Sequence, residues 1–118
     1  MTSKGSKSRI KWEGDSLKEI QSWPKNAKEN LGGDLNRLER NQEPLDAGYL
    51  KDGISELRER DKDFWYRVLY TLYSGWIYVL YCFKKKTNKT PQEAIDLALK
   101  RFNAAKERDA RSKGEKSA

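Results

Sequence analysis

The strongest apolar pattern in the chain is the stretch RVLYTLYSGWIYVLY at residues 67–81. Two runs rich in aromatic and β-branched residues, 65–73 and 76–83, flank the turn pair Ser74-Gly75. This arrangement is typical of a β-hairpin. The first run is apolar on both faces, which predicts a central strand of a sheet. A membrane-spanning helix is disfavoured because the apolar run is shorter than the roughly 20 residues that such a helix needs.

Weaker patterns on either side of the hairpin predict a chain with both helices and strands. Short alternations of apolar and polar residues indicate strands, whereas apolar residues spaced three and four apart indicate amphipathic helices. Pro24 should end the first helix, so two antiparallel helices should meet there. The expected elements are strands at 10–12, 48–51, 54–59, 65–73 and 76–83, and helices at 16–23, 26–41 and from 91 onward.

Two of these helices begin with residues that favour capping. Ser16 is followed three positions later by Glu19, which fits a capping box. The segment Thr90-Pro91-Gln92-Glu93 places a hydroxyl before a proline at the first helical position. We therefore expect the hydroxyls of Ser16 and Thr90 to cap their helices.

Charge is concentrated at the ends of the chain. Residues 1–9 contain three basic and no acidic side chains, residues 84–118 contain eleven and five, and residues 10–83 contain eleven and thirteen. The net charge is +7, and this distribution suits a polyanionic partner that is contacted by one surface. No apolar segment follows the basic N-terminus, so we expect a cytoplasmic protein without a signal peptide.

The length of 118 residues suits a single domain. We expect that domain at residues 10–106, with flexible tails at 1–9 and 107–118.

The residue inventory excludes several kinds of chemistry. The chain has no histidine and one cysteine, so neither a zinc site of the usual ligands nor a Ser-His-Asp or Cys-His site is possible. It also has neither a Walker-type loop nor a dinucleotide-binding glycine motif. Cys82 lies in the apolar run and is expected to be a buried small side chain. We expect no metal or cofactor, and an enzyme of this composition must use Arg, Lys, Tyr, Asp or Glu.

Two arginines are expected to meet on one face of the sheet. If strand 54–59 pairs antiparallel with strand 65–73, Arg58 comes close to Arg67. Guanidinium groups match phosphate oxygens in a two-pronged geometry, so the pair could bind a phosphate. Alternatively, Glu56 or another carboxylate neutralises the arginines as an ordinary ion pair. The spacing alone leaves both interpretations open.

Four segments resemble the phage-derived branch of the HigB/RelE-type toxins of bacterial toxin–antitoxin systems. They are WEGDSLKEIQSWP (12–24), GISELR (53–58), YRVLY (66–70) and FKKKTNKTPQEAIDLALKR (83–101). The resemblance covers about residues 10–102. It implies an α+β, RelE-like fold, in which a small twisted, mostly antiparallel sheet carries an N-terminal helical hairpin on one face and a C-terminal helix beside the other.

The resemblance also implies a function. Such toxins bind the ribosome and cut messenger RNA in the A site, by attack of a ribose 2′-OH on the adjacent phosphate. A cognate antitoxin, in this branch usually a HigA-like protein with a helix-turn-helix domain, holds the toxin inactive. Operator DNA would be contacted only through that antitoxin, and no membrane is involved.

The resemblance carries over to individual residues unevenly. Arg67 matches the arginine that contacts the scissile phosphate, and Arg58 matches a basic position on the same face. RelE-type members commonly have a lysine at the position of Glu56 and a tyrosine near Gln92, so the general acid and base are not assigned. We hypothesise that Glu56, or one of the clustered lysines 84–86 whose neighbouring charges favour proton loss, accepts the 2′-OH proton.

The candidate residues fall into two groups. Those proposed for catalysis are Arg67, Arg58, Glu56 and Lys86. Those proposed for RNA binding are Lys84, Lys85, Lys89 and Trp65, although an aromatic residue in a strand can equally belong to the core. Three other functions remain open: a ParE-like gyrase inhibitor on the same scaffold, a nucleic-acid-binding protein without catalysis, and a structural phage protein.

Overall fold

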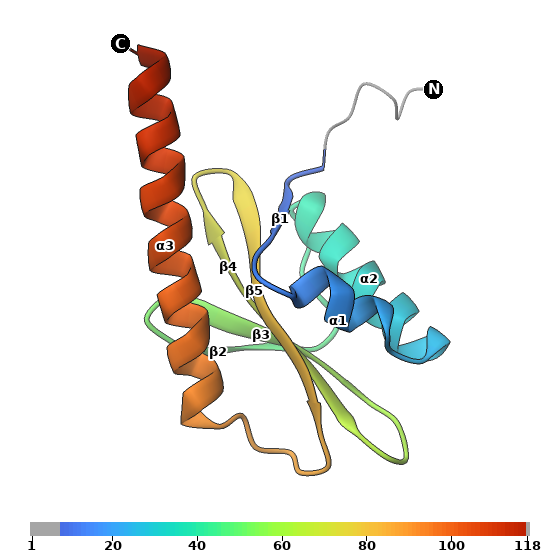
Figure 1. The fold of residues 1–118 in the computed structure, drawn as a ribbon. Helices are drawn as coiled ribbons and strands as arrows, with labels where there is room; N and C mark the ends of the chain where they lie inside the picture. Colours follow the sequence, from blue (N-terminus) through green and yellow to red (C-terminus); the bar gives the residue numbers. More distant parts are fainter. Residues whose placement is uncertain (1–7, 118) are drawn as a thin grey trace.

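A computed structural model of the chain describes residues 8–117, which form an α+β fold (Figure 1). The elements are β1 (Ile10–Trp12), α1 (Ser16–Gln21), α2 (Lys25–Glu39), β2 (Ala47–Lys51), β3 (Ile54–Arg60), β4 (Trp65–Tyr73), β5 (Trp76–Lys85) and α3 (Gln92–Ser117). The predicted fold class is confirmed, because a mostly antiparallel open sheet with helices at both ends of the chain is consistent with a RelE-like fold.

The sheet has five strands in the order β1-β5-β4-β3-β2. Consecutive strands from β2 to β5 pair antiparallel, whereas β1 pairs parallel with β5. The hairpin between β4 and β5 is confirmed, and its turn residues Ser74 and Gly75 have φ angles of 55° and 83°. A two-residue turn with both angles positive matches the twist of the paired strands. Strand β4 is central, as its two apolar faces predicted.

The two faces of the sheet have separate cores. Helices α1 and α2 cover one face and α3 covers the other, as Figure 1 shows. Burial of each large aliphatic side chain contributes roughly 1.5–3 kcal/mol to folding. The first core contains Leu31, Leu35, Leu57, Val68 and Val79. The second contains Ile54, Leu69, Leu80, Ala98 and Phe102.

Neither of the two hydroxyls predicted to cap a helix does so in the structure. Helix α1 is preceded by Asp15, which forms no side-chain cap, and Ser16 is buried. The carboxylate of Glu19 accepts a hydrogen bond from the indole N–H of Trp23 at 2.9 Å instead of closing a capping box. The hydroxyl of Thr90 donates to Glu56 at 2.6 Å. For Thr90 a partner distant in the chain has therefore replaced the local one, whereas the buried Ser16 hydroxyl has no hydrogen-bond partner among residues 8–117.

Contacts extend into both segments that were expected to be tails. Residues 1–7 lie outside the described residues, but the guanidinium of Arg9 donates to the main-chain carbonyls of Leu38 and Glu39 at 3.0 and 2.6 Å. Both carbonyls lie in the last turn of α2, where their free lone pairs attract a cation, although that of Leu38 also accepts from the main-chain N–H of Asn41 at 3.0 Å. Helix α3 continues past residue 107 to Ser117, although within residues 8–117 no helix is long and apolar enough to span a membrane.

Candidate functional site

Strands β3 and β4 bring the predicted arginines together. Arg58 lies directly opposite Arg67 in the antiparallel pairing, and Glu56 lies one alternation away on the same face. Residues on one face of a strand are separated by two positions, so these three side chains share the face that α3 covers further along. The predicted proximity of the two arginines is confirmed. Together with Asn88 and Thr90, these residues form what we call the arginine cluster.

Arg67 is the most buried charged group of the arginine cluster, with 3% of its surface exposed. Its Nη2 donates to the main-chain oxygen of Asn88 at 2.7 Å and to the Oδ1 atom of the same residue. Its guanidinium carbon lies 5.2 Å from the centre of the Trp65 ring, a favourable cation–π distance. Within residues 8–117, its Nε and Nη1 atoms have no hydrogen-bond partner.

The charge of Arg67 is held in an unfavourable environment. Burial lowers the pKa of Arg67, the nearby Glu56 carboxylate opposes this effect, and the neighbouring charge of Arg58 adds to it. Arginine nevertheless stays protonated in proteins. Buried donors are normally paired, so a buried cation with free donor capacity is suited to bind an anion that enters the site.

Glu56 bridges the two arginines and is itself 5% exposed. Its Oε1 lies 3.4 Å from Nε of Arg67, and its Oε2 lies 3.4 Å from Nη1 of Arg58. The hydroxyl of Thr90 donates to the same Oε1. The carboxylate interpretation that the sequence left open therefore describes the arrangement in this structure. Glu56 is also the carboxylate that lies beside Arg67, and a general base for attack on a phosphate held by Arg67 would have to lie there.

Arg58 is more completely paired than Arg67. Its Nε donates to Asp46 at 2.9 Å, and its Nη2 donates to the main-chain oxygen of Ala47 at the same distance. Gly48 leaves room for this guanidinium, because a Cβ at that position would lie 2.9 Å from Nη1 of Arg58. Asp46 and Gly48 are members of the site that sequence reasoning missed. The signal for them was weak, because both lie in a segment that was interpreted mainly as a loop.

The predicted lysines are divided between the two faces of the sheet. Lys84 pairs with Tyr66 and Lys85 with Trp65 at the end of β5. Lys85 therefore shares the face of Arg67, whereas Lys84 lies on the other face, with its ammonium 4.7 Å from the centre of the Phe64 ring. Lys86 and Lys89 lie in the loop that follows β5, and all four lysines are exposed.

Trp65 and a small hollow border the arginine cluster. The Trp65 ring is half-buried and lies between Arg60, whose guanidinium carbon is 4.5 Å from the ring centre, and Arg67. Phe83 lies opposite Arg67 in the pairing of β4 with β5. A cavity of about 300 Å³ opens beside it, lined by Tyr81, Phe83, Lys85, Pro91, Glu93, Ala94 and Leu97. Aromatic and basic groups thus lie next to the arginines.

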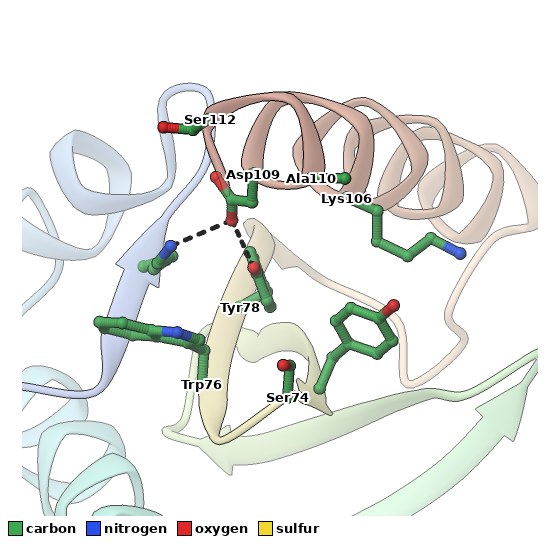
Figure 2. Close-up of a pocket in the computed structure, with 9 residues that line it drawn as sticks. Ser74, Trp76, Tyr78, Lys106, Asp109, Ala110 and Ser112 are labelled. Atoms are coloured by element: carbon green, nitrogen blue, oxygen red, sulfur yellow. Dashed lines mark hydrogen bonds and ion pairs between the residues drawn. The ribbon is translucent and has the colours of Figure 1, made fainter. Parts of the chain in front are cut away.

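A second charged cluster lies far from the arginines, around a cavity of about 330 Å³ between the hairpin and α3 (Figure 2). Asp109 accepts hydrogen bonds from the Lys11 ammonium at 3.0 Å and from the Tyr78 hydroxyl. Arg108 donates to both carboxylate oxygens of Glu13 at 3.0 Å. We call these five residues the Asp109 cluster. Sequence reasoning missed it because its members lie far apart in the chain.

The Asp109 cluster stabilises the fold by mutual pairing. Burial and the hydrogen bond to Asp109 raise the pKa of Tyr78 well above its usual range. Burial alone would raise the pKa of Asp109, but hydrogen bonds from Tyr78, Arg108 and Lys11 together hold it well below its usual range. The charged side chains of this cluster are paired with one another, so the cluster connects α3 to β1 and β5. Few of its donors and acceptors remain for a ligand.

The cysteine is not a nucleophile in this environment. Cys82 is buried in the core beneath α1 and α2, as predicted. Burial raises the pKa of its thiol to about 12, so the reactive thiolate is strongly disfavoured near neutral pH. The chemistry available near the arginines is therefore that of guanidinium, ammonium and carboxylate groups.

A comparison with protein families finds a match to most of the chain. The model of the family described as phage derived protein Gp49-like (DUF891) matches residues 18–103. The matched segment runs from α1 into α3 and contains every residue of the arginine cluster. A comparison with curated proteins found no significant match.

Proposed function

Because the chain belongs to the Gp49-like family of phage-derived proteins, which is a RelE/HigB-like toxin family, we propose that it is the toxin of a type II toxin–antitoxin system. Its activity in this proposal is ribosome-dependent cleavage of messenger RNA in the cytoplasm. The observation that carries the proposal is the buried guanidinium of Arg67, which within residues 8–117 keeps two N–H-bearing atoms without a hydrogen-bond partner. A phosphodiester offers the charged oxygens that such a group binds best.

The proposed reaction is an internal phosphoryl transfer. The ribose 2′-oxygen attacks the adjacent phosphorus, its proton passes to Glu56, and the bond from phosphorus to the 5′-oxygen breaks. The products are a 2′,3′-cyclic phosphate and a 5′-hydroxyl, whose proton comes from Lys86. Arg67 stabilises the charge that accumulates on the nonbridging oxygens, with Arg58 as the second cation. Glu56 contacts both arginines, so its carboxylate lies beside the groups that would hold the phosphate, which is where the base is needed.

The RNA on either side of the scissile phosphate would follow the basic rim of the site. Lys85 lies on the face of Arg67, and Lys89 lies in the loop that follows β5. Trp65 is half-buried beside the arginines, where one edge of its ring could contact a base. Lys84 is proposed as a more distant phosphate contact, because it lies on the opposite face of the strand.

The proposal is tested by messenger cleavage in a translating extract. The Arg67→Ala and Glu56→Gln variants should cut far more slowly than the wild type, whereas Arg111→Ala, which removes an exposed arginine at the distant end of α3, should cut normally. Undiminished cutting by both site variants would overturn the assignment of residues. If the wild type leaves messenger intact but traps gyrase on DNA, the chain is a ParE-like toxin, and binding to RNA without cutting would indicate a non-catalytic protein.

The proposed partner is a cognate antitoxin, which in this proposal is a HigA-like helix-turn-helix protein encoded beside the toxin. Growth arrest on expression of the chain should be relieved when the neighbouring reading frame is expressed with it. Growth arrest that no neighbouring protein relieves would contradict the pairing.

A further inference from the structure

The loop between β5 and α3, residues 86–91, covers the arginine cluster and is attached mainly through it. Asn88 accepts two hydrogen bonds from Arg67, and Thr90 donates one to Glu56. Among the backbone hydrogen bonds described outside helices and strands, none involves residues 86–90. Residues 86–89 are exposed. We call this segment the Asn88 loop.

The two oxygen atoms of Asn88 take up a donor of Arg67 that the proposed function would give to a phosphate. Both accept from Nη2 of Arg67, so this nitrogen is not free to bind an anion while the loop is in place. With 3% of its surface exposed, Arg67 cannot reach an RNA phosphate while the loop stays in place. Thr90 at the same time occupies Oε1 of Glu56, the atom that would accept the 2′-OH proton. In this arrangement the phosphate-binding cation and the base are both blocked.

We propose that the Asn88 loop is a lid that keeps the free protein inactive and is displaced by the phosphate of the substrate. The proposal rests on the function proposed above and adds the regulation of that same site. Phosphate oxygens are charged acceptors and form stronger hydrogen bonds with a guanidinium than the neutral oxygens of an asparagine. Segments with few buried contacts open at low free-energy cost. The exchange of Asn88 for phosphate is therefore favourable once RNA is present.

The loop also carries the charges that would attract the substrate. Lys86 and Lys89 lie on either side of Asn88 and are exposed. Exposed cations raise the local concentration of a polyanion and speed its arrival. RNA drawn to these two ammonium groups would pull on the segment that covers Arg67. The lid thus opens in response to the molecule that the site cuts.

The lid is tested by labelling arginines of the full-length protein with phenylglyoxal, followed by peptide mass spectrometry. Arg67 of the wild type should react slowly relative to the exposed Arg111. The double variant Asn88→Ala, Thr90→Val removes both side-chain attachments and leaves only the bond to the main-chain oxygen of residue 88. Labelling of Arg67 should become about tenfold faster, because hydrogen bonds that favour the closed loop are lost. Thr87→Ala changes an exposed residue of the same loop and should leave the rate unchanged.

A variant that should slow the labelling of Arg67 distinguishes an opened loop from a protein that has simply unfolded. Asn88→Asp places a carboxylate on Arg67, so labelling should be slower than in the wild type and messenger cleavage should fall. If Asn88 served only the fold, both substitutions at this position would loosen the site and speed labelling. That result, or equal labelling of Arg67 in all variants, would overturn the lid.

The same variants separate the lid from the proposed function. If labelling of Arg67 responds as expected but the wild type never cuts messenger, the lid stands and the proposed function fails. If the wild type cuts but labelling does not respond, the function stands and the lid fails.

Discussion

The two charged clusters lie at opposite ends of the β4–β5 hairpin and handle their charges differently. The Asp109 cluster lies near the hairpin turn, whereas the arginine cluster lies where β5 leads into the loop before α3 (Figure 1). Near the turn, Asp109 is 3.0 Å from Lys11 and 3.1 Å from Arg108. At the other end, the nearest carboxylate oxygen is 3.4 Å from Arg67. The charges near the turn are thus closely paired, whereas in the arginine cluster Arg58 is closely paired and Arg67 is not.

In the proposed function, this difference separates a structural site from a binding site. Removing charges from water is costly, and close pairing in the Asp109 cluster offsets much of that cost. Arg67 is more deeply buried, yet within the described chain its Nε and Nη1 atoms have no hydrogen-bond partner. A fold that retains an incompletely compensated buried cation is less stable than it could be. We therefore propose that the arginine cluster gives up stability for binding capacity.

The largest expected effect is on cleavage. Arg67→Lys keeps the positive charge but loses the planar fork of donors, so single-turnover cleavage on programmed ribosomes should fall by roughly 10²–10³-fold. Asp109→Asn removes a charge from the other cluster and should cut within about twofold of the wild type once its folded fraction is taken into account. If both variants fold and lose cleavage activity equally, the arginine cluster is not the catalytic one of the two.

The second expected effect is on stability. Here substitutions in the Asp109 cluster should cost more than substitutions in the arginine cluster. Asp109→Ala removes the acceptor of three hydrogen bonds, two of them from cations, and should lower the free energy of unfolding by about 2 kcal/mol. The double variant Glu56→Gln, Arg67→Met replaces a buried ion pair by uncharged side chains of similar size, and should stay within about 1 kcal/mol of the wild type. Urea unfolding measures both. A loss in the double variant larger than that in Asp109→Ala would mean that the arginine cluster stabilises the fold.

The sequence predicted those parts of the molecule that depend on short-range pattern. Ser74-Gly75 indicated the hairpin, and its position set the register of β4 with β5 near the turn. Beyond it, a register shift between Leu69 and Tyr70 displaces the pairing by one residue. The closeness of Arg58 and Arg67 followed because β3 and β4 are joined by a short turn, so alternation alone places the two side chains on one face. Both inferences needed only neighbouring segments of chain.

The parts that failed depend on residues far apart in the chain. Thr90 had every local feature of a capping residue, but its partner is Glu56, 34 positions away. Lys11, Tyr78 and Asp109 meet only because α3 extends along the sheet, past the boundary expected at residue 107. The burial of Arg67 depends on Asn88, in a loop whose path no periodic pattern encodes.

A third, smaller effect is expected in the pH dependence of stability. The pKa of Asp109 in the folded protein lies below its ordinary value of 3.8, so the unfolded chain binds this proton more readily. The stabilisation by Asp109 is therefore present above about pH 4 and is lost as the pH falls further. Asp109→Asn should show a shallower acid loss in urea unfolding between about pH 5 and pH 2. An unchanged acid slope would contradict the strong pairing of this carboxylate.

The stability of the protein at alkaline pH gives a second measurement on the Asp109 cluster. The pKa of Tyr78 is raised above its ordinary value of 10.0, so its stabilisation is present below about pH 10 and is lost as the pH rises further. Tyr78→Phe should flatten that alkaline loss. The Glu56→Gln variant of the arginine cluster serves as the control and should keep the wild-type alkaline slope.

The smallest expected effect is on the salt dependence of RNA binding, and it asks how far the binding face extends. Each contact of a cation with a single-stranded phosphate contributes about 0.7 to the slope of log affinity against log salt concentration. Lys85→Ala, beside the arginine cluster, should lower the slope for a single-stranded RNA by about that amount. Lys106→Ala, beside the Asp109 cluster, should leave it unchanged. If both lysines lower the slope equally, RNA follows the whole length of the sheet, and the closely paired end would belong to the binding surface as well.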